Sequence, residues 1–250
     1  MSRIKTILRR ASSWLRRDTN GFLKKVSGVI HVGANTGQER DLYQRHGLRV
    51  VWVEPIPEVF EVLKANIESH PLQSAIQSLV TDTDDEEYEF YVSNYDGLSS
   101  SILQLKLHKD IWPDVRFTRT LVLRSTTLPS LLQRERINVN DYDALIMDTQ
   151  GSELRILRGA APILRHLRFV KTEVPDFESY EGCCQLQDVE RFLQQYGFQE
   201  CAREPFARRQ GGGTYYDVTY ERVSDIPPGR SIRLHVTKGD GVRRSSPSDK

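Results

Sequence analysis

The hydrophobic pattern changes near residue 29, from a helical period to short apolar runs that alternate with helical stretches. The apolar runs typical of buried strands are residues 29–32, 50–53, 75–80, 144–147 and 169–174. The helical stretches are residues 38–46, 57–67, 153–164 (broken near Gly159 and Pro162) and 187–196 (ended by Gly197). This alternation is typical of βαβ units, and it predicts an α/β domain built on a mostly parallel sheet.

Further strand-like runs lie outside this alternation. Residues 88–92 and 121–123 predict two extra strands around a long irregular insertion, residues 93–119. Residues 198–202 and 214–220, joined through a run of three glycines, predict a closing antiparallel pair.

The two ends of the chain differ from the middle in composition. Residues 1–17 are basic and contain no acid, and their apolar residues recur at three- and four-residue steps. We expect a basic amphipathic helix in segment 1–27 that either binds an anionic membrane surface or packs on the domain; a transit peptide is the other alternative. Residues 224–250 are expected to form a flexible tail, which leaves residues 28–223 as the domain.

Charge and cysteine content narrow the class of protein. The 35 lysine and arginine residues nearly balance the 34 aspartate and glutamate residues, which disfavours a nucleic-acid partner. Cys183, Cys184 and Cys201 form neither a disulfide framework nor a zinc-ligand pattern. No apolar run approaches the roughly 18 residues of a membrane span, and no signal peptide is expected. We therefore expect a cytoplasmic protein, associated with membranes only if residues 1–17 bind lipid.

A glycine-bearing turn follows the first strand directly. In the sequence Gly33-Ala34-Asn35-Thr36-Gly37, small residues allow a ligand to approach the backbone, and Asn35 tolerates a left-handed conformation. Glu54 ends the second strand about twenty residues after this turn, where an acid can accept hydrogen bonds from ribose hydroxyls. The pair predicts a nucleoside-containing ligand and leaves open whether it is a nicotinamide cofactor or a methyl donor.

A long motif after the fourth strand decides between them. Residues 148–160, DTQGSELRILRGA, resemble the Asp-Val-(Glu/Gln)-Gly-x-Glu-x-x-(Val/Ile)-Leu-x-Gly-Ala signature of the FkbM family of methyltransferases. The glycine turn, the Glu54-Pro55 pair and the strand ending in Glu173 are similar to that family in the same order. The resemblance implies a Rossmann-like class I fold with a doubly wound, seven-stranded sheet, S-adenosyl-L-methionine (AdoMet) as cofactor, and O-methylation of a glycan, sugar or other small hydroxylated molecule.

The resemblance also implies roles for single residues. It puts Gly33, Ala34, Asn35 and Gly37 around the methionine part of AdoMet, Glu54 on the ribose, and Asp82 near the adenine. Asp82 lies in an acidic run, and such runs are more often solvated turns. His31 departs from the family pattern, in which an aspartate usually stands there, and we expect a hydrogen-bonded core residue instead.

Topology brings the two motifs to one site, because ligands of doubly wound sheets bind at the carboxyl ends of the strands where the order reverses. Asp148 is therefore expected at both the cofactor and the catalytic site. Asp148, Glu153 and Glu173 are the candidate general bases for a hydroxyl acceptor. The alternatives are that Asp148 caps the next helix through backbone N–H groups near Gly151, that Glu153 stabilises the first helical turn, and that Glu173 is a structural acid.

We find no metal-ligand spacing in the sequence. Three other functions remain as alternatives: an NAD-linked oxidoreductase, a non-catalytic AdoMet-binding or scaffold protein, and a nucleic-acid methyltransferase. The last is disfavoured by the near-neutral charge and by the absence of an Asn/Asp-Pro-Pro-aromatic motif after the fourth strand.

Overall fold

The computed structural model describes residues 18–223. The amphipathic helix expected in residues 1–17 and the tail expected from residue 224 lie outside these residues. The described chain begins with a 3-10 turn, Gly21–Lys25, whose Phe22 and Leu23 are buried against the domain. The ring of Phe22 packs on that of Phe169 at 5.3 Å between centroids, so packing on the domain begins before residue 28.

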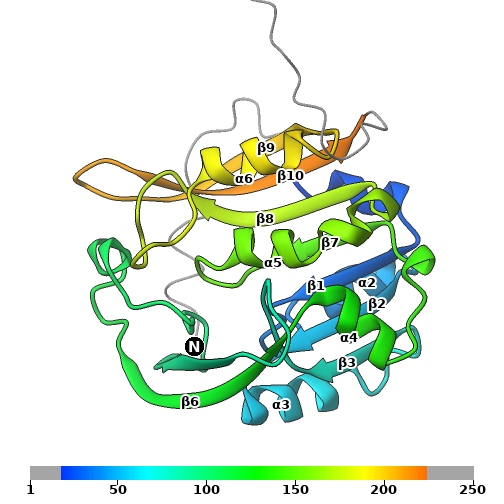
Figure 1. Ribbon diagram of the computed structural model, residues 1–250, viewed down its shortest axis with the longest axis horizontal. Helices are drawn as coiled ribbons and strands as arrows, with labels where there is room; N and C mark the ends of the chain where they lie inside the picture. The colour runs from blue at the N-terminus through cyan, green and yellow to red at the C-terminus, as the bar shows by residue number, and fades with distance from the viewer. Residues whose placement is uncertain (1–17, 224–250) are drawn as a thin grey trace, which may run out of the picture.

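A seven-stranded sheet forms the centre of the molecule (Figure 1). Its order is β3-β2-β1-β7-β8-β10-β9. The strands are β1 (Gly28–Val32), β2 (Arg49–Glu54), β3 (Gln73–Gln77), β7 (Ala144–Met147), β8 (Phe169–Pro175), β9 (Phe198–Arg208) and β10 (Thr214–Arg222). The strands from β3 to β8 pair in parallel, whereas β10 runs antiparallel to both β8 and β9. The expected doubly wound sheet with its closing antiparallel pair is confirmed.

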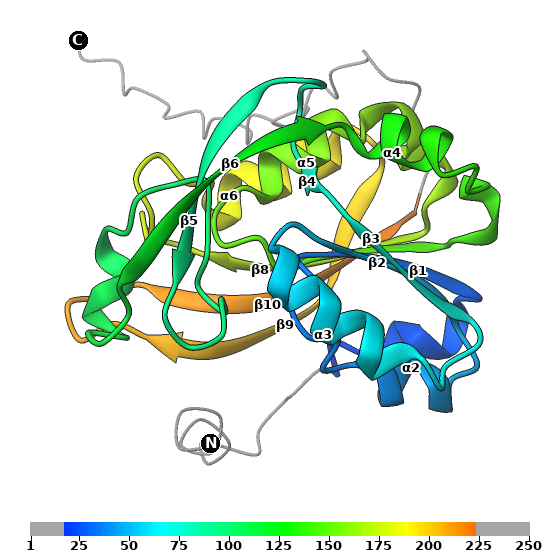
Figure 2. The same ribbon diagram turned by 90° about the horizontal axis from the view of Figure 1, so that it is seen from below.

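Helices cover both faces of this sheet (Figure 2). On one face lie α2 (Arg40–Arg45) and α3 (Pro57–Ile67), and on the other α4 (Leu128–Arg134), α5 (Glu153–Gly159) and α6 (Leu186–Gln194). A 3-10 turn, Ala161–His166, follows α5, so the helix breaks at the predicted place. Successive residues of each buried strand point to opposite faces, which gives two hydrophobic cores, one against each helical layer.

The predicted third strand, residues 75–80, is wrong as a single strand. It consists of β3 and of a separate short strand, β4 (Leu79–Val80), which belongs to a second sheet with the order β4-β6-β5. The other two strands of that sheet are β5 (Glu87–Ser93) and β6 (Phe117–Thr126). The chain leaves β2 after Gln77 because Leu79 and Val80 pair with Ser125 and Thr126 instead.

The insertion expected at residues 93–119 is shorter than predicted, since β6 already begins at Phe117. The remaining loop, residues 94–116, contains a 3-10 turn at Leu107–Asp110. A bridge between Leu105 and Tyr180 ties this loop to the segment after β8. Figure 2 shows β5 and β6 at one end of the molecule, beside the main sheet.

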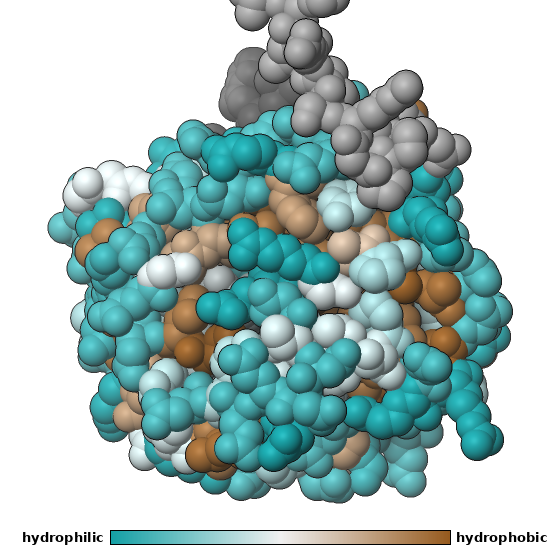
Figure 3. Space-filling view, viewed as in Figure 1, coloured by the Kyte–Doolittle hydropathy of each residue, from teal (hydrophilic) through white to brown (hydrophobic). Residues whose placement is uncertain are grey.

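The face of the described chain that Figure 3 shows is mostly hydrophilic, with apolar areas between polar side chains. Large exposed apolar side chains such as Val122, Leu98 and Tyr95 are few. Within residues 18–223, no helix has both the length and the apolar character that crossing a membrane requires.

Candidate active site

A cavity opens at the carboxyl ends of β1, β2, β7 and β8, where the strand order of the sheet reverses. The space between its walls, open mouth included, is about 880 Å³. Predicted site residues that line it are Gly33, Asn35, Glu54, Asp148 and Glu173. Residues from the insertion, among them Leu98, Ser100 and Ile102, form another wall.

The glycine turn after β1 owes its composition mainly to packing. Gly33 has a φ of 80°, and a Cβ there would lie 2.0 Å from the backbone oxygen of Asp148. Gly37, with a φ of 71°, would place a Cβ 2.8 Å from Leu63 Cδ1. Neither Ala34 nor Gly37 is among the residues that line the cavity, although both were expected at the cofactor. Asn35 has the predicted left-handed backbone, with a φ of 45°.

Glu54 lies at the end of β2 with its residue only 4 % exposed. One carboxylate oxygen accepts a hydrogen bond from the Asn35 backbone N–H at 2.8 Å and the other accepts one from the Ile56 N–H at 2.9 Å. Burial raises the pKa of Glu54 from 4.5 to about 7, against the lowering effect of these two hydrogen bonds. The carboxylate thus ties the glycine turn to the segment after β2 at the cavity wall.

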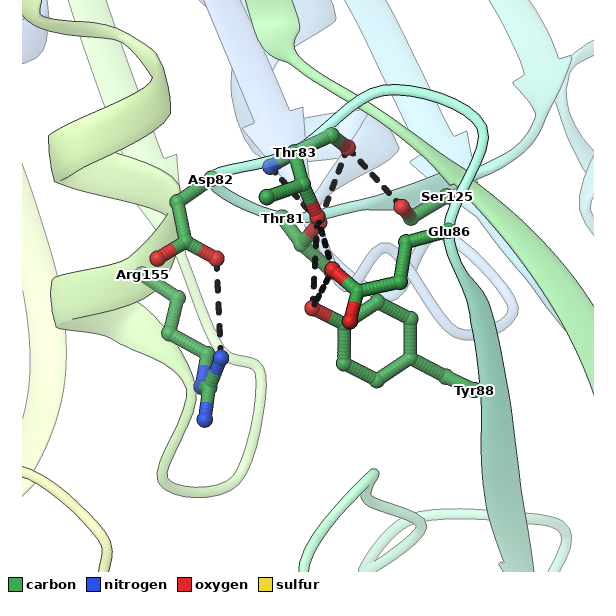
Figure 4. Close-up of polar contacts among 7 residues, drawn as sticks. All are labelled: Thr81, Asp82, Thr83, Glu86, Tyr88, Ser125 and Arg155. Atoms are coloured by element: carbon green, nitrogen blue, oxygen red, sulfur yellow. Dashed lines mark hydrogen bonds and ion pairs between the residues drawn. The ribbon is translucent and has the colours of Figure 1, made fainter.

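Apolar side chains continue the cavity beyond Glu54, where Ile56, Leu79 and Phe90 line it. Asp82 does not line the cavity, contrary to the expectation that it approaches the adenine. Its carboxylate faces Arg155 on α5, 3.6 Å from the guanidinium (Figure 4). The backbone of Thr81 and Asp82 packs against Gly159, which fixes the carboxylate on the side of α5.

Asp148 follows β7 and lines the cavity. Its Oδ1 accepts a hydrogen bond of 2.6 Å from Nε2 of Gln150. Burial is the main cause that raises the pKa of Asp148 from 3.8 to about 7, and neighbouring acids add to the rise. The alternative that Asp148 caps α5 is wrong, because the Gly151 N–H donates to Glu153 instead.

Glu153 is 1 % exposed and does not line the cavity. Its carboxylate accepts hydrogen bonds from the backbone N–H groups of Thr149 and Gly151 and from the Thr149 hydroxyl. The Cys184 thiol contacts it from the other side at 3.5 Å. Glu153 is therefore not placed as a general base, contrary to the expectation. Its carboxylate stabilises the loop between β7 and α5 through these hydrogen bonds.

Glu173 lines the cavity from β8 and stands opposite Asp217 of β10 in the strand register. Burial raises the pKa of Glu173 well above its ordinary value, and the nearby carboxyls of Asp148 and Asp217 raise it further. Asp148 and Glu173 therefore form a pair of half-buried carboxyls at the ends of neighbouring strands. Two such groups resist simultaneous ionisation.

His31 is the hydrogen-bonded core residue that its position in β1 suggested, although one edge of it reaches the cavity. Its Nδ1 lies 3.0 Å from the hydroxyl of Tyr43, and its ring stacks on Trp52 at 4.8 Å. Burial lowers the pKa of His31 to about 4, so the ring is neutral at physiological pH.

Sequence reasoning missed several residues that line the cavity. Gln38 and Glu39 lie between the glycine turn and α2, and Gln150 lies within the DTQG motif. The sequence could have indicated Gln150 as a site residue, because it is part of the motif by which the site was predicted. It gave no such indication for Gln38 and Glu39, since polar residues before a surface helix are common.

The family follows from comparison with known proteins. A sequence profile described as the methyltransferase FkbM domain matches residues 31–200, more than half of the chain. This chain belongs to the FkbM methyltransferase family. It is an AdoMet-dependent methyltransferase, and the alternative of an NAD-linked oxidoreductase is wrong.

A curated relative of this FkbM methyltransferase is the 2-O-methyltransferase NoeI of Sinorhizobium fredii (strain NBRC 101917 / NGR234). It is 28% identical over 193 residues, which cover 73% of this chain and 78% of the relative. Among solved structures, M. capricolum TrmK in complex with S-adenosyl-homocysteine aligns with a TM-score of 0.48 at 9% identity, covering 84% of this chain and 70% of that one. The O-methyltransferase from Bacillus cereus aligns with a TM-score of 0.43 at 13% identity, covering 87% and 86%.

The cavity of this FkbM methyltransferase fits AdoMet in its chemistry. Glu54 has carboxylate oxygens available to ribose hydroxyls, and the apolar patch of Ile56, Leu79 and Phe90 suits an adenine ring. Of the described residues that line the cavity, four are acids and none is lysine or arginine. An acidic lining suits a sulfonium cation, and it disfavours the pyrophosphate of a dinucleotide.

Proposed function

We propose that the enzyme transfers the methyl group of AdoMet to a hydroxyl of an uncharged sugar, glycan or other small natural product. The observation that carries this proposal is the Asp148–Glu173 carboxyl pair in the wall of the AdoMet cavity. A hydroxyl acceptor must lose a proton during transfer, and a carboxylate at the reaction centre can receive it. When bound, AdoMet supplies an electrophilic methyl group.

In this proposal Asp148 receives the proton and Glu173 helps to position the acceptor. A pair of carboxyls whose surroundings push their pKa values apart divides into one proton acceptor and one proton donor. The hydrogen bond from Gln150 favours the ionised form of Asp148, whereas the described structure gives Glu173 no such donor and its pKa lies well above the ordinary value. The surroundings thus favour the protonated form more in Glu173 than in Asp148, and a protonated Glu173 can donate a hydrogen bond to the acceptor.

The charge of the cavity supports an uncharged acceptor. The Glu39 carboxylate and the ionised forms of Glu54 and Asp148 would repel a phosphate or carboxylate group, and no described lining residue is a lysine or arginine that could bind one. The curated relative is named a 2-O-methyltransferase, which agrees with transfer to oxygen. By the same charge argument, we propose no nucleic-acid substrate.

The test is a transfer assay with methyl-labelled AdoMet and a panel of acceptors. The panel contains neutral oligosaccharides of hexoses and N-acetylhexosamines, the matching sugar phosphates, and transfer RNA. Label is expected in a neutral oligosaccharide, and hydrolysis followed by mass spectrometry should locate it on oxygen. Transfer only to a phosphorylated sugar or to RNA would refute the proposal, and AdoMet binding with no transfer to any acceptor would favour the non-catalytic alternative.

We also propose that the enzyme works in the cytoplasm. Support comes from its three cysteines, which are free thiols in the described chain, two of them buried. Fractionation of the source cells with an antibody against the protein tests this, and recovery from an oxidising compartment would contradict it.

A further inference from the structure

We propose that Gln150 is a positioning residue that orients the Asp148 carboxylate and favours its ionised form, and that the insertion of residues 94–116 holds Gln150 in place. Its role as a partner of a general base rests on the proposed function. Its effect on the Asp148 carboxyl does not, because that effect can be measured in the absence of any acceptor.

The Gln150 side chain is held at both ends. Its Nε2 donates to Asp148 Oδ1 at 2.6 Å, and the hydroxyl of Tyr180 lies 2.9 Å from its Oε1 as donor. Tyr180 is completely buried, and its hydroxyl also lies 3.2 Å from the carbonyl oxygen of Ser99 in the insertion. An ionised carboxylate can only accept, so the nitrogen end of the amide faces Asp148. The oxygen end is then left to accept from the Tyr180 hydroxyl, whose proton is shared with the Ser99 carbonyl oxygen.

The backbone of Gln150 points to the same role. Its φ of 54° is left-handed, a conformation that glycine adopts at much lower cost than glutamine. Its carbonyl oxygen accepts a hydrogen bond of 2.8 Å from the buried hydroxyl of Ser101, also in the insertion. An unfavourable backbone conformation of this kind persists where the surrounding structure holds it and where it serves a function. Here it places the Gln150 side chain against Asp148.

The surroundings of Asp148 explain why it needs such a partner. The charged and titratable groups around it are mostly acids: Glu39 before α2, Glu153 on α5, Glu173 on β8 and Asp217 on β10, with Lys171 of β8 and neutral Tyr180 behind them. These acids and burial all favour the protonated form of Asp148. The hydrogen bond from Gln150 opposes them.

The experiment measures the titration of Asp148 in the wild type and in Gln150→Gly. Glycine removes the side chain and relieves the left-handed backbone, so this variant is expected to fold. The Asp148 signal is followed by carbon-13 NMR in protein labelled at the aspartate carboxyl carbon, and it is assigned by its loss in Asp148→Asn. We expect the pKa of Asp148 to rise by about one pH unit in Gln150→Gly, as for the loss of a hydrogen bond to a charged group.

Two further variants make the test specific. Tyr180→Phe removes one hydroxyl without touching Asp148, and it should raise the pKa of Asp148 by a smaller amount because Gln150 is no longer fixed. Gln199→Ala removes an exposed glutamine on β9, and it should leave the titration unchanged. An unchanged Asp148 pKa in folded Gln150→Gly would overturn the proposal, whatever the acceptor turns out to be.

With an acceptor in hand, rates give the second readout. At pH 7 the transfer rate of Gln150→Gly should fall about fivefold, because a pKa near 8 leaves about a tenth of Asp148 ionised in place of about half. At pH 9 the rate should return to within about twofold of the wild type. A loss that is equal at both pH values would mean that Gln150 serves only the structure of the loop.

Discussion

Replacement of Glu54 by glutamine keeps the shape of the side chain and removes its charge. In the folded protein the carboxyl is buried at the end of β2, and burial raises its pKa to about 7, against 4.5 for an ordinary glutamate. The two backbone hydrogen bonds from Asn35 and Ile56 do not outweigh this effect. Glu54 therefore lowers the stability of the ligand-free protein when it is ionised.

The sign and size of the effect follow from the two pKa values. Below pH 4.5 the carboxyl is protonated in both the folded and the unfolded state, and its ionisation costs nothing. Between pH 4.5 and 7 the unfolded chain releases the proton while the folded protein keeps it, so the free energy of unfolding falls as the pH rises. Above pH 7 the cost is complete, at about 3 kcal/mol for pKa values of about 7 and 4.5.

Urea denaturation of the wild type and Glu54→Gln at pH 5 and pH 8 measures this cost. The variant loses an acceptor for one backbone N–H, which costs about 1 kcal/mol at both pH values. Relative to the wild type, its free energy of unfolding should gain about 2 to 3 kcal/mol between pH 5 and pH 8. The same difference between the two proteins at both pH values would refute the assignment of a buried, reluctantly ionised carboxyl.

AdoMet binding should respond in the opposite direction. We expect the ionised carboxylate to accept hydrogen bonds from the ribose hydroxyls of AdoMet. Glu54→Gln should therefore weaken binding about 10- to 100-fold at pH 8, equivalent to about 1.5 to 3 kcal/mol. In the wild type the affinity should decline as the pH falls below 7, whereas the variant should lack this dependence. Titration calorimetry at both pH values is the measurement, and equal affinities for the two proteins at pH 8 would remove Glu54 from the cofactor site.

Further predictions concern the other parts of the site. Asp148→Asn should fold and still bind AdoMet, but it should transfer methyl about 10² to 10⁴ times more slowly in single-turnover assays. A wild-type rate would exclude Asp148 as the base. Gly33→Ala should lower the free energy of unfolding in urea by about 2 to 5 kcal/mol, because the added Cβ meets a backbone oxygen. Gly47→Ala is the control: it has open space around it and should cost only about 1 kcal/mol. Equal costs for the two variants would contradict the packing argument. Glu153→Ala should cost about 1 to 3 kcal/mol of stability, with the folded fraction still active, and an inactive, fully stable variant would restore it to catalysis. Residues 1–17 are expected from their sequence to form a basic amphipathic helix. Their removal should leave the AdoMet affinity unchanged and reduce co-sedimentation with anionic vesicles. A full-length protein that does not pellet with these vesicles would contradict membrane binding by this segment.

Local pattern was sufficient for the elements of the main sheet. Strand β7 and helix α3 have the bounds that the sequence predicts, because each is an uninterrupted apolar run or an apolar face bounded by a clear start. Proline in the first turn marks the beginning of α3. Gly197 has the expected left-handed backbone, with a φ of 81°, but α6 already ends at Gln194, two residues before the predicted end. These signals act within a few residues, so they survive in any tertiary context.

The second sheet was not predictable in the same way. Strand β6 extends over ten residues, but half of them are exposed, and only residues 121–123 had an apolar pattern. Strand β4 has two residues, and its pairing with Ser125 and Thr126 joins segments more than forty residues apart. Helix α4 went unpredicted, although Thr127 caps it and Pro129 stands in its first turn, because it is only seven residues long.

The sequence by itself predicted the edge of the sheet at which the candidate site lies and, through the family signature, its cofactor. The glycine turn, Glu54 and the DTQG motif each follow a buried strand, and parallel strands bring their carboxyl ends to one edge. Only the tertiary structure decided which of the acids face the cavity. Glu153 turns back to the amides of its own loop, and Asp82 turns to Arg155. The physical reason is that a carboxylate points toward the nearest hydrogen-bond donors and positive charges. The positions of these groups depend on loop geometry and on contacts between distant segments, which no local sequence pattern contains.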